Sequence, residues 1–414
     1  MIKLLTLALL VPCVSIALPV KKGENFKVQI PGEYIIKSNG EKSIMNVKRV
    51  LGKNLFLVKA NSIKSLSMFE HASPNYAYYG EYKDVIKKNK NPNTPNDVDF
   101  SSQFHHQMIK TTSAWGVTKG SKEIVIAVTD NEFQLDHTDL QTTWYKNKNE
   151  IPDNGIDDDN NGYIDDVLGY DFIGQDNDVD SIEEPTHGTH VSGTISATVN
   201  NSIGGSGVAP NIRVMPLRWY GIEGRWTSAI VAEAYHYAVD NGAKIISTSY
   251  NIDFFADDQV YLDAVQYAKD NDVLIFNSAG NGGKLDPDRG SVKDVILVCS
   301  VQSADDGDHD IKSRFSNYGK EIDICAPGDP VYAPIQGGSW STGPQNKYGE
   351  LSGTSMAAPI AASVAALIWS VNPNFTAADV RQRLYESADN IDAKNSKYIG
   401  TLGAGRVNAF TAVK

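Results

Sequence analysis

The sequence predicts an α/β protein: a mostly parallel, doubly wound sheet with helices on both faces, preceded by a small α+β domain. Three observations favour this fold class. Continuous aliphatic runs such as "EIVIAV" (123–128) are typical of strands that are buried on both faces. Helical patterns alternate with these runs, which is the order that a parallel sheet requires. A Lys-, Asn- and Pro-rich linker, residues 83–98, separates the two parts.

The main part, residues 99–414, follows this alternation. "TSAIVAEAYHYAVDNGAK" (227–244) has helical spacing, a Thr or Ser cap at its start and Gly242 at its end. It leads into the strand "KIISTS", and a second helical pattern, residues 257–273, leads into the strand "VLIFNSAG". The strands "DVILVCSV" and "EIDICAP" and the long apolar helix "GTSMAAPIAASVAALIWS" follow. In such sheets reactive groups collect at the carboxyl ends of the strands.

The amino-terminal part begins with "MIKLLTLALLVPCVSIALP", in which Lys3 precedes an apolar run and a small-residue site. This layout predicts a signal peptide over residues 1–17 and a protein that is secreted, either outside the cell or into the periplasm. The run is too short to span a membrane, and we expect no later segment to span one. Residues 18–82 are predicted to form the α+β domain from the strands "FKVQI", "GEYIIKS" and "NLFLVKA" and a short helix near residues 61–69.

The charge of the chain is unevenly placed. The net charge is −12, and twelve acids without a single Lys or Arg lie between Asp153 and Glu184. Residues 18–98 instead carry fourteen Lys and Arg against seven Asp and Glu. A basic segment of this kind can dock on an acidic body through electrostatic attraction. Because it has no interleaved aromatics and no nucleic-acid motif, we expect no nucleic-acid partner.

Two cysteines, Cys299 and Cys325, remain after the signal peptide. Both lie in apolar, strand-like contexts, which favours buried free thiols, with a disulfide between neighbouring strands as the alternative. Their spacing does not resemble a metal site.

Four polar residues are predicted to meet at one edge of the sheet. Asp130 ends the first aliphatic run, and Asn281 follows a strand end in "NSAGNGG". His187 in "EPTHGTHVSGTIS" and Ser355 in "ELSGTSMAAPIAA" lie at helix starts, where free N–H groups favour negative charge. A Ser hydroxyl needs a neighbouring base, and an imidazole base needs a carboxylate that fixes its tautomer. An amide such as that of Asn281, with the N–H of Ser355, can hold an oxyanion.

These motifs resemble those of the subtilisin-like serine peptidases, in the chain order Asp, His, Ser. "HGTHVSGT", "GTSMAAP" and the "AGN" turn carry the resemblance, together with "GVAPN" and "GAGRVNA", and it covers roughly residues 100–414. It implies that Asp130 orients the base, His187 is the general base, Ser355 is the nucleophile and Asn281 is the oxyanion donor. One departure follows Asp130, where the family has Ser or Thr and then Gly but this chain has Asn131 and Glu132. Asp136 and Asp139 are the rival acids. His190 is expected to be structural, and His105 and His106 are expected to lie at the surface.

Two loops predict a requirement for calcium. "DDDNNGYIDD" (157–166) offers oxygen ligands at alternate positions before a turning Gly, as calcium loops do, although it is no full EF-hand. Its candidate ligands are Asp157, Asp159, Asn161, Tyr163, Asp165 and Asp166. The alternative is a solvated acidic loop. A second site is implied by the resemblance of "VNNSIGG" to the family's calcium loop, with Val199, Asn201, Ile203, Gly205 and Asp139 as ligands and Gln103 as a weaker candidate.

The resemblance also implies that peptide substrates pair as a strand between two segments of the enzyme, around Tyr220 to Gly224 and around Ser249 to Asn251. The substrate-binding residues would be Gly221, Gly224, Ser249, Tyr250, Asn251, Ser278, Ala279 and Gly280. Asn251 replaces a Gly that borders the pocket for the residue before the scissile bond. We therefore expect a neutral, apolar preference by default, while Asp286 and Asp288 in a divergent loop keep a basic preference open.

Residues 18–82 resemble an inhibitory propeptide, through "GEYIIKS" and "ASPNYAYY". The resemblance implies self-cleavage between about Tyr79 and Asp99, whereas a permanent accessory domain is the alternative. The sequence thus predicts a secreted, monomeric, calcium-stabilised serine endopeptidase that is made as a zymogen, with polypeptide substrates and its own propeptide as partners. Two other functions remain: a non-catalytic binding protein on the same scaffold, and a processing enzyme for one partner protein.

Overall fold

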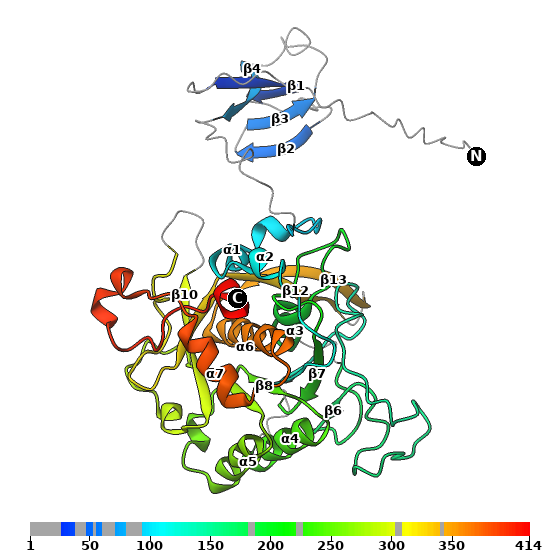
Figure 1. Ribbon diagram of the computed structural model, residues 1–414. Helices are drawn as coiled ribbons and strands as arrows, with labels where there is room; N and C mark the ends of the chain where they lie inside the picture. Colours follow the sequence, from blue (N-terminus) through cyan, green and yellow to red (C-terminus); the bar gives the residue numbers. More distant parts are fainter. Residues whose placement is uncertain are drawn as a thin grey trace, which may run out of the picture. The chain divides into compact units, whose positions relative to one another are not determined.

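A computed structural model gives the structure of the chain (Figure 1). The residues that it describes are 26–37, 47–52, 55–59, 71–79, 93–180, 187–220, 227–302, 309–339 and 343–414. The chain divides into two compact units, residues 1–90 and residues 91–414. The predicted signal peptide and the predicted helix near residues 61–69 lie outside the described residues.

The first unit contains a four-stranded antiparallel sheet in the order β2-β3-β1-β4. The strands are β1 (Phe26–Lys37), β2 (Val47–Gly52), β3 (Leu55–Lys59) and β4 (His71–Tyr79). The first two predicted runs merge into the single long strand β1, and "NLFLVKA" supplies β3.

The second unit is built on a seven-stranded sheet in the order β11-β10-β9-β8-β5-β7-β6, in which every pairing is parallel. Its strands are β5 (Val125–Asp130), β6 (Tyr170–Asp171), β7 (Arg213–Arg218), β8 (Ile245–Thr248), β9 (Leu274–Ser278), β10 (Val295–Gln302) and β11 (Ile324–Asp329). The predicted mostly parallel, doubly wound sheet is therefore confirmed.

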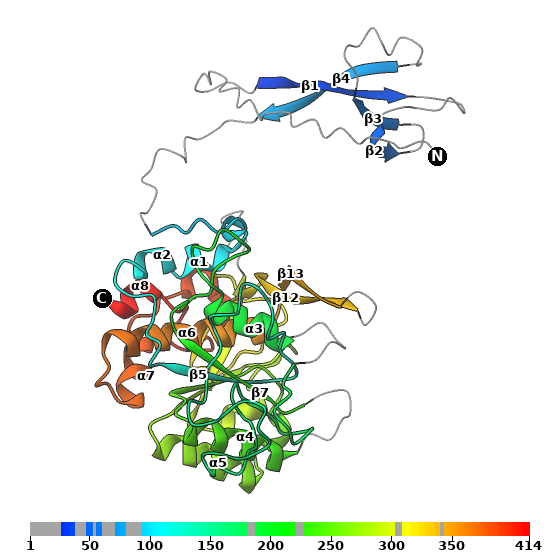
Figure 2. The ribbon, with the colours of Figure 1, turned by 90° about the vertical axis from the view of Figure 1, so that its right-hand side faces the viewer.

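Helices cover both faces of this sheet because alternate residues of its strands point to opposite sides. In β5, Ile126 and Val128 belong to one buried cluster and Val125 and Ala127 to the other. Figure 2 shows α3 and α6 on one side of β5 and β7, with α4 and α5 on the other. The helices are α1 (Phe104–Met108), α2 (Thr111–Ala114), α3 (His187–Ser196), α4 (Ser228–Asp240), α5 (Gln259–Asp270), α6 (Thr354–Val371), α7 (Ala377–Glu386) and α8 (Ala409–Val413).

The start of α4 is fixed by the expected type of cap, because the Thr227 side chain accepts a hydrogen bond from the N–H of Ile230. Helix α6 differs from expectation. Among the described residues it is the one helix that is long and apolar enough to cross a membrane, although we expected no such segment after the signal peptide. Its most apolar window is 83% buried inside the protein, so packing in the core accounts for its composition.

Cys299 on β10 and Cys325 on β11 are paired in register, with Cα atoms 4.4 Å apart, and they form a disulfide. The favoured expectation of free thiols is therefore wrong and the alternative holds. Adjacent positions on neighbouring strands bring two Cβ atoms within bridging distance, which the separate runs "VILVCSV" and "IDICAPG" do not reveal.

A further hairpin, β12 (Val331–Ser339) and β13 (Gly343–Leu351), was not predicted. Its register pairs Val331 with Leu351 and Ser339 with Gly343. The carbonyl of Val331 accepts a hydrogen bond from His190 on α3, so the hairpin is tied to the helix that carries His187.

Candidate active site

The carboxyl ends of three neighbouring strands and the starts of two helices meet at one edge of the large sheet. Asp130 is the last residue of β5, Ser249 follows β8 and Asn281 follows β9 by three residues. His187 opens α3 and Ser355 is the second residue of α6. Parallel strands end at a common edge, which is why residues so far apart in the sequence come together.

Asp130 and His187 form a close pair. The Nδ1 atom of His187 lies 2.9 Å from Oδ1 and 2.8 Å from Oδ2 of Asp130, whose side chain is buried. Burial disfavours the imidazolium, but the charge and hydrogen bond of Asp130 outweigh it, so the pKa of His187 is raised. With Nδ1–H donated to the carboxylate, Nε2 is the nitrogen that can take a proton.

The Asn131–Glu132 departure is accommodated without left-handed backbone at either residue. The Asn131 side-chain oxygen accepts hydrogen bonds from the N–H groups of Glu132 at 2.8 Å and Gly188 at 3.2 Å, which ties the turn to the first residues of α3. The Glu132 carboxylate is buried and lies 3.9 Å from the Arg218 guanidinium on β7. A Cβ at Gly188 would approach the Glu132 carbonyl to 2.4 Å, so the Gly of "HGTH" permits this contact.

Ser355 is held by a reciprocal pair of hydrogen bonds. Its Oγ donates to the carbonyl of Ser249, and the Oγ of Ser249 donates to the carbonyl of Ser355, both at 2.9 Å. Proton transfer needs a contact between Ser355 and His187, and such contacts commonly tighten only when substrate is bound.

Asn281 is oriented by the residue before Ser355. Its Oδ1 accepts hydrogen bonds from the backbone N–H and the hydroxyl of Thr354, each at 2.9 Å. Because a backbone N–H can only donate, the amide oxygen must face Thr354 and the amide nitrogen is left as a donor. Asn281 is exposed to solvent, so its amide nitrogen is available to an oxyanion.

Asn317 is a positioning residue that the sequence did not predict. Its Nδ2 donates to the carbonyl of Ala279 at 2.8 Å, and its Oδ1 accepts from the N–H of Gly282 at 3.1 Å and of Lys284 at 2.8 Å. It therefore fixes the turn that carries Asn281. Gly280 has a φ of +97°, and a Cβ there would lie 2.6 Å from the Asn317 amide, which explains the Gly.

Of the predicted substrate residues, Ser249 contacts Ser355 directly. Tyr250 places its hydroxyl 3.2 Å from the Thr129 hydroxyl, and its ring centroid lies 4.1 Å from that of Trp219. The Asn251 side chain accepts a hydrogen bond from Arg289, which the sequence did not single out. Ser278 and Ala279 are buried on the opposite segment, next to Gly280. Gly221 and Gly224 lie outside the described residues.

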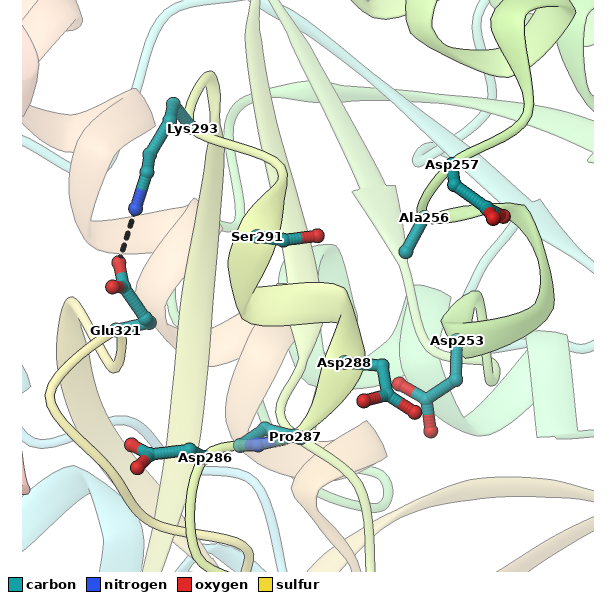
Figure 3. Close-up of a pocket in the computed structure, with 9 residues that line it drawn as sticks. All are labelled: Asp253, Ala256, Asp257, Asp286, Pro287, Asp288, Ser291, Lys293 and Glu321. Atoms are coloured by element: carbon teal, nitrogen blue, oxygen red, sulfur yellow. Dashed lines mark hydrogen bonds and ion pairs between the residues drawn. The ribbon is translucent and has the colours of Figure 1, made fainter.

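Asp286 and Asp288, which kept a basic preference open, line a surface hollow of about 610 Å³ together with Asp253, Asp257 and Glu321 (Figure 3). Lys293 beside this hollow is paired with Glu321. Asp253 also contacts the buried Arg289.

The acidic loop forms one tight carboxylate cluster. Ligand atoms of Glu150, Asp159 and Asp166 lie within 4.8 Å of one another. Asp166 is fully buried, and this burial raises its pKa. Glu150 was not predicted, because it lies before the loop motif. Asp157 and Asp165 accept backbone N–H bonds of the loop, the Asn161 amide donates to Asp166, and Tyr163 contacts Glu233 through its hydroxyl.

The second predicted calcium set is only partly assembled. The Asn201 amide donates to Asp139 at 2.6 Å, the Tyr348 hydroxyl donates to it at 3.3 Å, and burial raises the pKa of Asp139 to about 7. Val199, Ile203 and Gly205 lie in the same loop. Asp97, which precedes α1, supplies a carboxylate that binds this loop. It accepts hydrogen bonds from the N–H groups of residues 200–202. Gln103 instead bonds Ser206.

Three histidines that the sequence analysis set apart from the catalytic role, His105, His106 and His190, are buried. His190 Nε2 bonds the Val331 carbonyl, and burial lowers the pKa of His190 to about 3. His105 and His106, expected at the surface, are also buried, with ring centroids 4.3 Å apart. Neutral imidazoles pack as aromatic rings in a core, and burial lowers the pKa of His106 to about 4.

Comparison with known proteins finds that the chain is similar to peptidases. The profile of the subtilase family matches residues 121–405. A thermophilic serine proteinase of Bacillus sp. (strain AK1) is 33% identical over 90% of this chain and 79% of its own length. Thermitase of Thermoactinomyces vulgaris is 35% identical over 78% of this chain and 99% of its own. The solved structure of a protease from Pseudoalteromonas arctica PAMC 21717 aligns with a TM-score of 0.60 and 26% identity, covering 77% of this chain and 98% of that one.

Proposed function

The chain belongs to the subtilase family, and on that premise we propose that it is a secreted, self-processing precursor whose mature domain is stabilised by calcium. It is a serine endopeptidase. The observation that carries the proposed site is the Asp130–His187 pair at the sheet edge where the Ser355 hydroxyl contacts the Ser249 carbonyl.

The proposed reaction is acyl transfer. His187 Nε2 takes the proton of Ser355 as Oγ attacks the scissile carbonyl, and Asp130 stabilises the resulting imidazolium. The same proton then passes to the leaving amine, which departs and leaves an acyl-enzyme. Water, deprotonated by His187, hydrolyses this ester and restores the Ser355 hydroxyl.

The tetrahedral intermediates place negative charge on the former carbonyl oxygen. The Asn281 nitrogen and the N–H of Ser355 are the proposed donors, and the bonds from Thr354 hold the Asn281 amide in that orientation before substrate arrives. Preorganised donors of this kind are worth roughly 10²–10³ in rate each.

Two features support processing of the precursor. The unit of residues 1–90 is distinct from the unit of residues 91–414, so a cut between Tyr79 and Asp99 separates two folded bodies. The basic residues 18–98 and the acidic segment after Asp153 have opposite charge, which favours inhibitory docking of the first part on the second. The predicted signal peptide, residues 1–17, supports secretion.

Intact mass spectrometry of the purified full-length chain in calcium, compared with Ser355→Ala, tests this proposal. The parent should lose an amino-terminal fragment that ends between Tyr79 and Asp99, while the Ser355→Ala chain stays whole. Ser352→Ala, which removes an exposed hydroxyl three residues away, is the matched control and should be processed normally.

If neither the parent nor the control is cut although both fold, self-processing is wrong. Labelling with a serine-reactive fluorophosphonate then separates two explanations. A labelled parent is an active enzyme with a permanent accessory domain, whereas an unlabelled one supports the binding-protein alternative.

The proposed calcium site is the cluster of Glu150, Asp159 and Asp166. Its donors are all oxygens, as calcium prefers, and the buried Oε2 of Glu150 has no hydrogen-bond partner among the described residues. Three carboxylates this close repel one another unless a cation is bound. Asp139 is a weaker candidate, because among the described residues it belongs to no cluster of three possible ligand side chains.

Chelation of calcium should therefore lower the melting temperature of the Ser355→Ala protein by several degrees, and added calcium should restore it. Saturation about a hundredfold above Kd is worth about 3 kcal/mol. Glu150→Gln should abolish most of this calcium-dependent shift in differential scanning calorimetry. Asp178→Asn removes an exposed charge of the same acidic segment and should keep the full shift. An unchanged shift in Glu150→Gln would place the cation elsewhere.

A further inference from the structure

We expect the side chain that precedes the scissile bond to point between two chain segments, and we call the space between these segments the gap. Strands β8 and β9 are paired up to Thr248 and Asn277, and residues 249–251 and 278–280 continue them. The Ser249 carbonyl touches Ser355 Oγ, and Asn281 follows the second segment directly. A peptide whose carbonyl lies between Ser355 and Asn281 therefore directs this side chain between the two segments.

Arg289, in the turn of 3-10 helix η4 (Asp288–Ser291), lies within this gap. It is only 3% exposed, and its Nη1 donates to the Ser278 carbonyl at 2.6 Å and to the Tyr250 carbonyl at 3.3 Å. Its Nη2 donates to the Asn251 side chain. A Cβ added to Gly280 would lie 3.3 Å from Nη2, so the guanidinium occupies the space beside that glycine. One side chain thus joins both walls.

The charge and the donors of Arg289 are already engaged. Nε donates to Asp253 Oδ1 at 2.8 Å and Nη2 to Oδ2 at 3.3 Å. Although burial acts in the opposite direction, these bonds lower the pKa of Asp253. A guanidinium has five N–H donors, and the bonds to Asp253, Asn251 and the two carbonyls use all three of its nitrogens. Few N–H groups of Arg289 are therefore free to bind a substrate carboxylate.

We propose that Arg289 is a specificity-determining residue that closes the inner end of this gap, so that the enzyme cleaves after small uncharged residues such as Ala, Gly or Ser. The inference rests on the proposed function and names the substrate class of the same site. The guanidinium occupies the space that a large aromatic side chain of the substrate would need. Arg289 offers N–H donors and no acceptor to a Lys or Arg side chain, which is itself a donor.

The test compares peptide p-nitroanilides that differ only in the last residue, Ala, Phe, Lys or Glu, cleaved by the enzyme obtained from the full-length chain. We expect kcat/KM for Ala to exceed the other three values by about tenfold or more, because steric exclusion by one pocket residue has this scale. Arg289→Ala should raise the Phe value about tenfold relative to Ala. Lys293→Ala removes an exposed cation near the same turn and should leave the profile unchanged.

Preference of the parent enzyme for Phe, Lys or Glu overturns the proposal without any variant, which covers the case in which Arg289→Ala fails to fold. A folded Arg289→Ala enzyme with an unaltered Phe-to-Ala ratio also overturns it. The failure of the proposed function looks different: no peptide is cut, and a fluorophosphonate does not label Ser355.

Discussion

Replacing Ser355 with Ala should lower kcat for a peptide amide about 10⁶-fold, the scale known for the nucleophiles of related subtilisins. The hydroxyl is the atom that forms the acyl-enzyme, and no other group at the start of α6 can replace it. KM should change little because the substrate segments 249–251 and 278–280 remain in place. The melting temperature should also change little, since Ser355 is only partly buried and loses a single donated hydrogen bond.

Steady-state kinetics on an Ala-terminated p-nitroanilide measure this loss, and differential scanning calorimetry checks the fold. Some catalysis should remain, because the Asn281 amide is held by Thr354 and not by Ser355, so it still stabilises an oxyanion formed by attack of water. Ser352→Ala serves as the control and should retain full activity. A loss smaller than about 100-fold would mean that the nucleophile lies elsewhere.

The fold was predictable because its signals are local. A continuous aliphatic run such as residues 123–128 is typical of a strand whose side chains are buried on both faces of a sheet. Parallel topology then places Asp130 at the reactive edge. The hairpin of β12 and β13 gave no such signal, because Pro334 and Gly337 interrupt its first strand and remove the alternation that marks a strand.

The principal site residues were predictable because they lie in compact motifs, whereas their supports were not. Thr354 orients Asn281 across 73 positions, and Asn317 fixes the same turn from a later strand connection. Glu150 precedes the acidic motif that it completes. Such partners are neighbours in the folded chain but not in the motifs, so the spacing of residues in the sequence does not reveal them. Arg289 was missed for the same reason.

The turn after Asp130 shows how a motif can change while its chemistry is kept. Without the Gly, Glu132 must adopt a different backbone or tolerate strain. It keeps a negative φ, and its carboxylate faces Arg218. Asn131 meanwhile binds the start of α3. The departure therefore strengthens the link between β5 and the helix of His187, and it leaves the carboxylate of Asp130 in contact with the imidazole.

Asp130→Asn should consequently lower kcat/KM at neutral pH by about 10⁴-fold. The carboxylate accepts the Nδ1 proton of His187 through both oxygens and so holds Nε2 as the base. An Asn side chain can instead donate a hydrogen bond to Nδ1, which leaves the imidazole proton on Nε2. A protonated Nε2 cannot accept the proton of Ser355. Without the negative charge, the imidazolium that forms during attack is also left unstabilised in a buried site.

The pH profile distinguishes this role from a structural one. The base must be neutral, so activity is lost as pH falls through the pKa of His187. Because this pKa is raised, the acid limb of the parent enzyme should lie at higher pH than for an ordinary imidazole. Asp130→Asn removes the charge that raises this pKa, so its acid limb should move to lower pH. Asp136→Asn, which alters the exposed rival acid, should change neither rate nor limb. An unmoved limb in Asp130→Asn would show that another group orients the base, because burial alone would otherwise lower the pKa of His187.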